Sequence, residues 1–399
     1  MRLGELLNVQ NGYAFSSKDY SKSGHFVMRI GNVQNGIISV ADPKFINLPP
    51  DGKLDRFILS EGDILVSLTG NVGRVGVIEK EHIPAVLNQR VAKLTVRNNS
   101  PVAKDFLLLF LLGDWFRDEL TSAGHGAAQQ NVSTKDLVEI RLPIPPLPEQ
   151  QRIVGILDRA FDGIATAKAN AEKNLQNARA LFESYLKSAF AQRDPESINV
   201  GWYNTKLAEL ASVQSGAGFP IAAQGKVQGG IPFYKVSDMN IVGNERSMIY
   251  ENNSITEAVR RQLKAFKFPE GSVIFPKIGG AIATNKKRLT TRECCVDNNV
   301  MGVIPKAEKI DSEFLYFFFL GRNLSEFANE AHLPSIKKSV VEDWGICVPE
   351  TLAEQRIVVG KLEELSSETQ KLESLYQRKL VAIEALKKSL LHQAFTGAL

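Results

Sequence analysis

The feature that most constrains this sequence is a repeat at about half its length. The segments Leu3–Leu6 and Val9–Phe15 return as Leu207–Leu210 and Val213–Phe219. Four further segments return in the same order: residues 27–32 as 233–238, 61–66 as 270–275, 88–91 as 297–300, and 151–154 as 355–358. Collinear matches with small changes of offset imply a tandem duplication with loop insertions, rather than a solenoid of many short units. A chain of 399 residues also exceeds what one hydrophobic core usually holds, so we expect two globular units.

The first part of each repeat predicts a β-rich domain. Over about 150 residues, short apolar runs such as Gly62–Ser67 and Arg74–Ile78 alternate with Gly, Asn and Pro, a pattern typical of strands and turns. Residues 105–120 and 312–328 are dense in apolar and aromatic side chains. We expect one short buried helix in each domain at these positions.

The second part of each repeat predicts a long helix. After Pro148 as far as Ala191, and again from Leu352 to Phe395, there is no proline and almost no glycine. Apolar residues recur at heptad spacing in both stretches, and we expect the two helices to pack as antiparallel arms of a coiled coil, with independent solvated helices as the alternative. The predicted seam consists of Ile153, Leu157, Ala160, Ile164, Ala167, Ala171, Asn174, Ala178, Leu181 and Tyr185 in the first helix and Leu362, Leu365, Thr369, Leu372, Tyr376, Lys379, Ile383, Leu386 and Leu390 in the second.

The predicted fold is therefore α+β, a pseudo-two-fold tandem repeat of a β-rich domain followed by a long helix. B-DNA is itself locally two-fold, so such a chain can read two separated half-sites, and each domain can diverge to read different bases. The target would then be bipartite and asymmetric. A helix of about 45 residues is about 65 Å long, which limits the gap between half-sites to roughly 20 base pairs.

Two segments carry a family resemblance. Residues 143–153, Pro-Ile-Pro-Pro-Leu-Pro-Glu-Gln-Gln-Arg-Ile, resemble the start of the central conserved region of type I restriction-modification specificity subunits. The ending, residues 390–399, is similar to the C-terminal region of that family. The resemblance covers essentially the whole chain. The second copy of the opening motif departs slightly, because Ala353 precedes Glu-Gln-Arg where a proline is usual.

The resemblance implies a DNA-specificity subunit without catalytic activity of its own. Its target-recognition domains would span residues 1–147 and 196–350, and its helical spacers residues 148–195 and 351–399. The implied partners are double-stranded DNA, two DNA adenine methyltransferase subunits and, through these, restriction subunits. S-adenosylmethionine, ATP and magnesium are expected in those partners, and no cofactor in this chain. No apolar run approaches the roughly 20 residues that span a bilayer, and the N-terminus lacks the features of a secretory signal, so we expect a cytoplasmic protein without membrane contact.

Polar loop residues at matching points of the two domains are candidate DNA contacts. The glycine-bearing loop between two predicted strands of the first domain can contact phosphates or base edges, or can be a plain hairpin, and the amides near residues 88 and 298 can read adenine or brace a loop. Residues 285–288 concentrate positive charge and suit phosphates. The candidates are Ser67, Thr69, Asn71, Arg74, Asn88, Gln89, Arg90, Gln129 and Gln130 in the first domain and Lys277, Asn285, Lys286, Lys287, Arg288, Asn298, Asn299, Lys337 and Lys338 in the second.

Rival functions make different demands on the sequence. An enzyme acting on DNA would need a cofactor or metal constellation, but there is no nucleotide-binding glycine loop and no methyltransferase motif, and the three cysteines and five histidines lack ligand spacing. The net charge of +4 decides little. A protein-only coiled-coil adaptor would explain the helices but not the duplicated domains. The specificity subunit of a type II-like enzyme remains open as a relative of the main hypothesis.

Overall fold

The structure, a computed structural model, describes residues 1–123, 131–191, 200–227 and 229–399. It divides into two compact units: unit 1 comprises residues 1–172 and 378–399, and unit 2 comprises residues 173–377. Each unit holds one β-rich domain together with part of each long helix. This division does not test the limits predicted between domains and helical spacers, which stay predictions.

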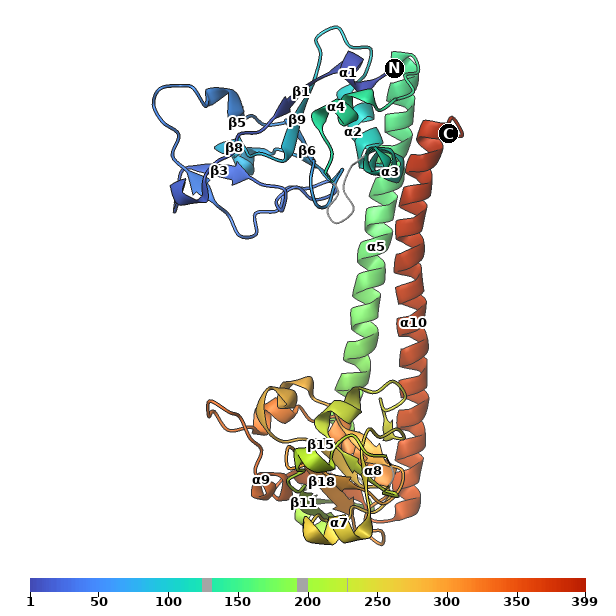
Figure 1. The fold of residues 1–399 in the computed structure, drawn as a ribbon. Coiled ribbons are helices and arrows are strands. Elements are labelled where there is room, and N and C mark those ends of the chain that lie inside the picture. The colour runs from blue at the N-terminus through green and yellow to red at the C-terminus, as the bar shows by residue number, and fades with distance from the viewer. Residues whose placement is uncertain (124–130, 192–199, 228) are drawn as a thin grey trace. The chain divides into compact units, whose positions relative to one another are not determined.

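Two sheets form the β-rich part of unit 1 (Figure 1). The first is antiparallel and has the order β1-β9-β6-β7, with strands at Leu7–Asn11, Val91–Val96, Ile64–Ser67 and Val75–Val77. The second has the order β2-β4-β3-β8-β5, with strands at Tyr20–Ser21, Phe45–Ile46, His25–Met28, Ala85–Leu87 and Ile58–Leu59. The short helices of this unit are α1 at Leu3–Leu6, α2 at Lys104–Leu112, α3 at Asp114–Ser122, α4 at Thr134–Glu139 and the 3-10 turns at Ser17–Asp19, Asp55–Phe57 and Lys80–His82.

The burial of strand β6 on both faces explains why residues 64–66 are all apolar. Ile64 and Val66 belong to the core that includes α2, whereas Leu65 belongs to the core between the two sheets. Successive side chains of a strand point to opposite faces, so a strand covered on both faces is a continuous apolar run instead of an alternating one. The first sheet therefore lies between the helices on one face and the second sheet on the other.

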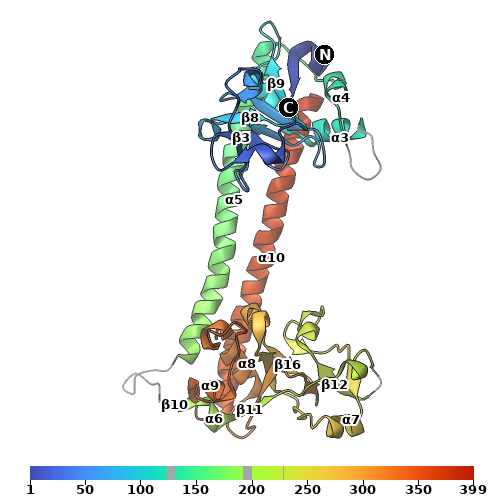
Figure 2. The same ribbon diagram turned by 60° about the vertical axis from the view of Figure 1, so that its left-hand side comes forward.

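Unit 2 repeats this arrangement with additions. Its main sheet has the order β11-β18-β15-β16-β13, with strands at Ala211–Ser215, Val300–Pro305, Val273–Pro276, Arg288–Thr290 and Ser247–Met248. A smaller sheet, β14-β12-β17, has strands at Ser254–Ile255, Ile231–Tyr234 and Cys295–Val296, and a pair is formed by β10 and β19 at Trp202–Lys206 and Gly345–Pro349. In Figure 2 the main sheet lies beside α8, whereas β12 lies further out with α7. The helices are α6 at Leu207–Leu210, α7 at Glu257–Gln262, α8 at Ser312–Leu320, α9 at Lys338–Glu342 and the 3-10 turns at Ile221–Ala223, Val236–Asn240, Gly279–Thr284 and Leu324–Phe327.

Strand register confirms the duplication at the level of individual residues. Ile64 pairs with Leu94 in unit 1, and Val273 pairs with Val303 in unit 2. The sequence offset between the two units is 209 residues for both members of the pair, from 64 to 273 and from 94 to 303. The four strands β1, β9, β6 and β7 thus correspond in order to β11, β18, β15 and β16.

The prediction of one short helix in each domain was wrong in extent. In unit 1 the chain leaves the helix at Gly113, where ψ is 149°, and starts α3 immediately afterwards. In unit 2, α8 ends before Gly321 and a 3-10 turn follows at Leu324–Phe327. Glycine has a low helix propensity, and here Gly113 and Gly321 end α2 and α8.

The two predicted long helices are present as α5 at Leu147–Phe190 and α10 at Leu352–Thr396. In unit 1 they run antiparallel, since Arg152 bonds to the carbonyl oxygen of Leu399 and Lys168 pairs with Glu384. In unit 2, Arg179 of α5 pairs with Glu373 of α10. The antiparallel pairing that we predicted is therefore present.

The predicted seam is only partly correct. Its buried members are Ile153, Leu157, Ala171, Ala178, Leu362, Thr369 and Ile383, and its half-buried members are Ala160, Ile164, Ala167, Leu365, Tyr376 and Leu390. Leu181, Tyr185, Leu372 and Leu386 are instead 60%, 43%, 41% and 51% exposed, and Asn174 and Lys379 are exposed as well. An α-helix has 3.6 residues per turn, so a strict heptad line drifts across its surface. In α5 the buried line has moved to Phe182, Leu186 and Phe190 by the end of the helix.

A buried glutamine fastens each long helix to its own domain. The Gln150 side chain accepts a hydrogen bond from Ala103 N at 2.8 Å and donates to Pro101 O and Pro145 O at 2.7 and 2.9 Å. The Gln355 side chain likewise accepts from Asp311 N and donates to Lys309 O and Pro349 O at 2.8, 3.0 and 3.2 Å. By its contacts the counterpart of Gln355 is therefore Gln150, and not Gln151 as the sequence match suggested.

The far ends of the long helices close the same kind of aromatic cluster in the two units. In unit 1, Phe395 of α10 packs on Phe106 and Phe110 of α2, with ring centroids 5.0 and 5.4 Å apart. In unit 2, Phe190 of α5 packs on Phe314 and Phe318 of α8 at 5.1 and 5.9 Å. Each domain is thus covered by the start of one long helix and the end of the other.

Candidate nucleic-acid interface

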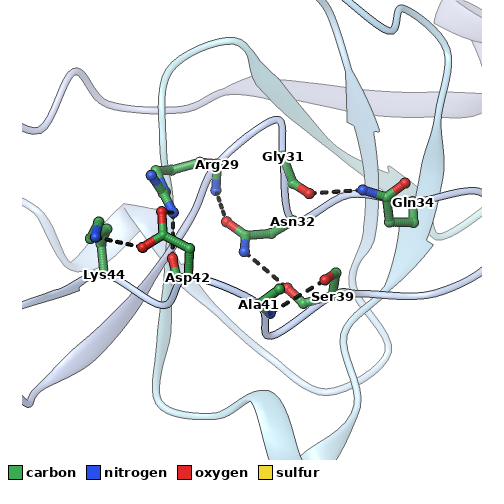
Figure 3. A network of polar contacts seen from close by, with 8 residues as sticks. All are labelled: Arg29, Gly31, Asn32, Gln34, Ser39, Ala41, Asp42 and Lys44. Atoms are coloured by element: carbon green, nitrogen blue, oxygen red, sulfur yellow. Dashed lines mark hydrogen bonds and ion pairs between the residues drawn. The ribbon is translucent and has the colours of Figure 1, made fainter. Parts of the chain in front are cut away.

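The loop that follows β3 in unit 1 is held in shape by its own polar groups (Figure 3). Asn32 is buried; its Oδ1 accepts from Arg29 N at 3.1 Å and its Nδ2 donates to Ser39 O at 2.9 Å. Arg29 Nη2 donates to the carbonyl and carboxylate oxygens of Asp42 at 2.5 and 3.2 Å, and Lys44 Nζ lies 2.6 Å from Asp42 Oδ1. The hydrogen bonds from Lys44 and Arg29 hold the pKa of Asp42 below its usual range, so the carboxylate stays ionised and neutralised.

The loop between β6 and β7 meets this segment through a cation and an amide. Arg74 Nη1 donates to Gln34 Oε1 at 2.7 Å, and Gln34 Nε2 donates to Gly31 O at 2.9 Å. Ser67 is fully buried, with its hydroxyl bonded to Asn71 O and accepting from Arg74 N. Its burial corrects the expectation of a DNA contact at Ser67, because the hydroxyl is used to close the hairpin. Asn71 is exposed.

The turn between β8 and β9 lies next to both loops. Asn88 is 8% exposed, and its Oδ1 accepts a hydrogen bond from Gln89 N. It therefore braces the turn, which is one of the two roles that the sequence suggested for this residue. Gln89 and Arg90 are exposed. Arg90 Nη1 donates to Thr69 Oγ1 and to Asn131 Oδ1, each at 3.2 Å. Thr69 is 7% exposed and therefore serves as a support for Arg90 rather than as a surface contact.

These segments surround an open cleft of about 440 Å³ in unit 1. Its lining residues come from the loop after β3 and the turn before β9, and they are Arg29, Ile30, Gly31, Asn32, Ala41, Asp42, Asn88, Gln89 and Arg90. A cleft of this size with amide and guanidinium groups at its edge can take up the polar edge of a planar ligand.

Unit 2 brings together residues of the same kinds at the matching places. Lys286 Nζ bonds to Asn240 Oδ1, as Arg74 does to Gln34 in unit 1. The turn between β17 and β18 is braced by Asp297, which is buried and accepts from Asn299 N at 3.0 Å, and burial raises the pKa of Asp297. Asn298 is exposed.

Two corresponding sets of side chains result. The first polar cluster consists of Gln34, Arg74, Gln89 and Arg90, and the second polar cluster consists of Asn240, Lys286, Asn298 and Asn299. Behind each lies one more cation: Arg29 in unit 1, and Lys235 in unit 2, whose Nζ bonds to Gln224 Oε1 at 2.7 Å. Gln34, Asn240, Arg29 and Lys235 were missed from the sequence. The repeated segments at 27–32 and 233–238 pointed to this loop, but nothing in the sequence joined it to residues 74 and 286.

The structure corrects the expected role of Lys287 as a DNA contact in the basic loop of unit 2. It is 1% exposed, and its Nζ donates to Asn285 Oδ1 and Arg322 O at 2.7 and 2.6 Å. Burial lowers the pKa of Lys287 to about 7. Arg288 also points inward, since its Nη1 and Nη2 donate to the carbonyl oxygens of Lys287 and Met239. Neither side chain is placed to meet a phosphate.

The buried Lys287 should leave a signature in the pH dependence of stability. Unfolded chains keep this lysine protonated up to its ordinary pKa of 10.5, whereas the folded unit releases the proton above about pH 7. The free energy of unfolding is therefore expected to rise between pH 7 and 10.5, with a slope from this group of at most about 1.4 kcal/mol per pH unit. Urea unfolding of Lys287→Met should lack that part of the slope, and Lys286→Met should keep it. Equal slopes in all three proteins would contradict the burial of Lys287.

The remaining candidates are dispersed or lie outside the described residues. Gln129 and Gln130 fall outside them. Lys277 is half-buried and donates from Nζ to Ser215 Oγ at 3.0 Å, and burial lowers its pKa. Asn285 has a left-handed backbone with φ of 54° and caps the 3-10 turn. Lys337 and Lys338 are exposed at the start of α9, where Lys338 lies 3.5 Å from Glu342. Their contact with DNA stays a prediction.

A metal site and a membrane-spanning helix are both absent from the described part of the chain. No group of three or more His, Cys, Asp or Glu side chains there could hold a metal ion. No helix in those residues has the length and apolar character needed to cross a membrane.

Comparison with known proteins identifies the family. The model of the type I restriction modification DNA specificity domain matches residues 1–176 and 199–380, one copy for each half of the repeat. The chain belongs to this family of DNA specificity domains. Its relatives are type I restriction enzyme specificity subunits, and like them it has two DNA specificity domains.

Individual relatives match to different extents. The EcoAI specificity subunit of Escherichia coli is 32% identical over 163 residues, a match that covers 39% of this chain but only 27% of that subunit. The StySPI specificity subunit of Salmonella potsdam is 22% identical over 94% of this chain and 82% of that subunit. A solved chain of a type I R-M system shares the fold with a TM-score of 0.77 at 16% identity, covering 100% of this chain and 97% of its own length.

Proposed function

We propose that this chain is the sequence-recognition subunit of a type I restriction-modification enzyme and binds a bipartite, asymmetric DNA target. One observation carries the proposal: matching polar clusters stand at the same place in two DNA specificity domains, with different side chains in each. Arg74 and Gln34 in unit 1 correspond to Lys286 and Asn240 in unit 2. Since base identity is read by such donors and acceptors, one chain can specify two different half-sites.

The proposed role is recognition without catalysis. The expected partners are two DNA adenine methyltransferase subunits and, through them, restriction subunits, which would supply S-adenosylmethionine, ATP and magnesium chemistry. A cytoplasmic location follows from that role. The two long helices would set a fixed gap between the half-sites. They also carry the exposed apolar side chains Leu181, Tyr185, Leu372 and Leu386, which suit a surface covered by partner subunits.

Selection of DNA by the purified complex tests this proposal. The chain would be co-purified with the methyltransferase encoded beside it and incubated with a pool of random duplexes. We expect the enriched duplexes to share two short specified parts separated by a constant number of unspecified base pairs. Binding should weaken with salt, with log K falling by about 0.9 per log unit of salt for each phosphate contacted.

Other results would point elsewhere. A complex that forms with the methyltransferase but enriches no sequence would support the protein-only adaptor. Selection of one uninterrupted motif would contradict the assignment of a half-site to each unit. A partner that cleaves as well as methylates within one chain would indicate the type II-like arrangement.

A further inference from the structure

One backbone feature of the first polar cluster is unusual. In the turn from Asn88 to Val91, where Val91 N donates to Asn88 O at 3.3 Å, Arg90 has φ of 71°. This left-handed region suits glycine or asparagine at the third position of such a turn, and other residues are strained there by about 1 kcal/mol or more. Apart from glycines, the described residues with positive φ are Arg90, Asp42, Lys264 and Asn285.

In the matching turn of unit 2, the residue type and the backbone conformation are combined in the opposite way. From Asp297 to Val300 it closes with Val300 N donating to Asp297 O at 3.0 Å. Asn299, in the place of Arg90, does not have a positive φ. The chain thus places an arginine where asparagine would fit better, and an asparagine where the backbone does not require one. Arg90 is exposed, so packing in a core does not account for its presence.

The side chain of Arg90 is held in one orientation. Its Nη1 bonds to both Thr69 Oγ1 and Asn131 Oδ1, and Thr69 is itself buried and paired through its backbone with Asn131. The hydrogen bonds of Arg90 to Thr69 and Asn131 use Nη1, which leaves Nη2 as a donor at the edge of the cleft. A planar donor group fixed in this way suits a ligand with acceptors in a set geometry.

The cleft beside Arg90 favours a base edge over a phosphate. The carboxylate of Asp42 lines the same cleft and would repel a phosphate, although Arg29 and Lys44 neutralise much of its charge. A phosphate contact also needs no fixed orientation of the cation. Guanine offers two neutral acceptors, O6 and N7, on its major-groove edge, and arginine is their commonest partner.

We propose that Arg90 reads a guanine in the half-site bound by unit 1, and that the strained turn exists to present it. The inference rests on the proposed function, since it assigns one base of that target. Unit 2 has no arginine in the second polar cluster, where Asn298 and Asn299 occupy the turn. The two half-sites therefore differ at the position that this turn contacts.

The test is sequencing of methylated adenines in cells that express the chain with its methyltransferase. We expect the wild-type motif to contain a guanine in one half, and Arg90→Asn to accept other bases at that single position. Methylation of the original motif should fall about 10- to 100-fold, as one bidentate base contact is worth about 1–3 kcal/mol. The other half of the motif should not change.

A stability measurement and one further variant separate an effect on base reading from an effect on folding. Arg90→Asn suits the left-handed backbone, so its thermal midpoint should match that of wild type within about 2 °C. Thr69→Val removes one support of Arg90 and should relax the same base to a smaller degree.

Three outcomes would overturn the inference: a wild-type motif without guanine in either half, an Arg90→Asn motif that is unchanged, or a uniform loss of methylation without change of motif. In the last case Arg90 contacts a phosphate. The complete absence of a two-part motif would instead overturn the proposed function itself.

Discussion

Reversing the charge at Arg74 and Lys286 together is expected to lower the affinity of the assembled complex for its target by about 100-fold or more at physiological salt. Both cations stand at the start of the fourth strand of the shared sheet, and each is held toward the proposed DNA face by an amide oxygen. Glutamate at both positions would replace attraction to the negatively charged DNA by repulsion. The slope of log K against log salt should also become less steep, by the contribution of about two cations. Titration of labelled duplex at several salt concentrations measures both effects.

A matched control lies at the other end of the same sheet. Strand β18 begins at Val300, beside the second polar cluster, and ends at Pro305, a few residues before the exposed Lys309. Lys309→Glu makes the same change of charge as either single reversal but lies beyond the far end of that strand, and we expect less than about a twofold effect. If Lys309→Glu weakened binding as much as the double reversal, or the double reversal had little effect on a folded complex, the proposed interface would be wrong.

Replacing either buried glutamine by leucine is expected to destabilise its own unit by about 3 kcal/mol. Gln150→Leu leaves Ala103 N, Pro101 O and Pro145 O without the partner that they share, and unpaired buried groups cost about 1–3 kcal/mol each before relaxation. Gln355→Leu does the same in unit 2. Because two units need not unfold together, hydrogen exchange measured separately in α2 and α8 is the appropriate readout.

The neighbouring Gln151 provides the control. It has the same side chain one position along α5 but is exposed, so Gln151→Leu should change stability by no more than about 0.5 kcal/mol. Gln150→Leu should accelerate exchange in α2 and leave α8 unchanged, and Gln355→Leu should do the reverse. Equal effects of Gln150→Leu and Gln151→Leu would contradict the anchoring role.

Structural features that depend on nearby residues alone, such as the long helices, were predictable from the sequence. The long helices follow from composition, and their observed bounds lie within about one residue of the predicted ones. The seam was less predictable, because which face of a helix is buried depends on what it meets. Leu181 continues the heptad line but is exposed, whereas Phe182 one residue later packs on the core of unit 2.

The candidate site shows the same distinction. The turns at residues 88–91 and 297–300 were found because the repeat aligns them, whereas Gln34 and Asn240 were missed because only the folded chain brings them to Arg74 and Lys286. Lys287 was misplaced for a simpler reason. A run of cations does not show which of them point inward, and in the folded unit both Lys287 and Arg288 donate to backbone carbonyl oxygens.

The central claim is that the two units read two halves of one target, and the methylation pattern of wild-type protein tests it most directly. Genomic DNA would be sequenced for methylated adenines in cells carrying the chain and its methyltransferase, with cells carrying the methyltransferase alone as the control. We predict methylation confined to one motif with two unlike specified parts and a constant gap of at most roughly 20 base pairs. Methylation at a continuous motif, or the same pattern without this chain, would contradict the account.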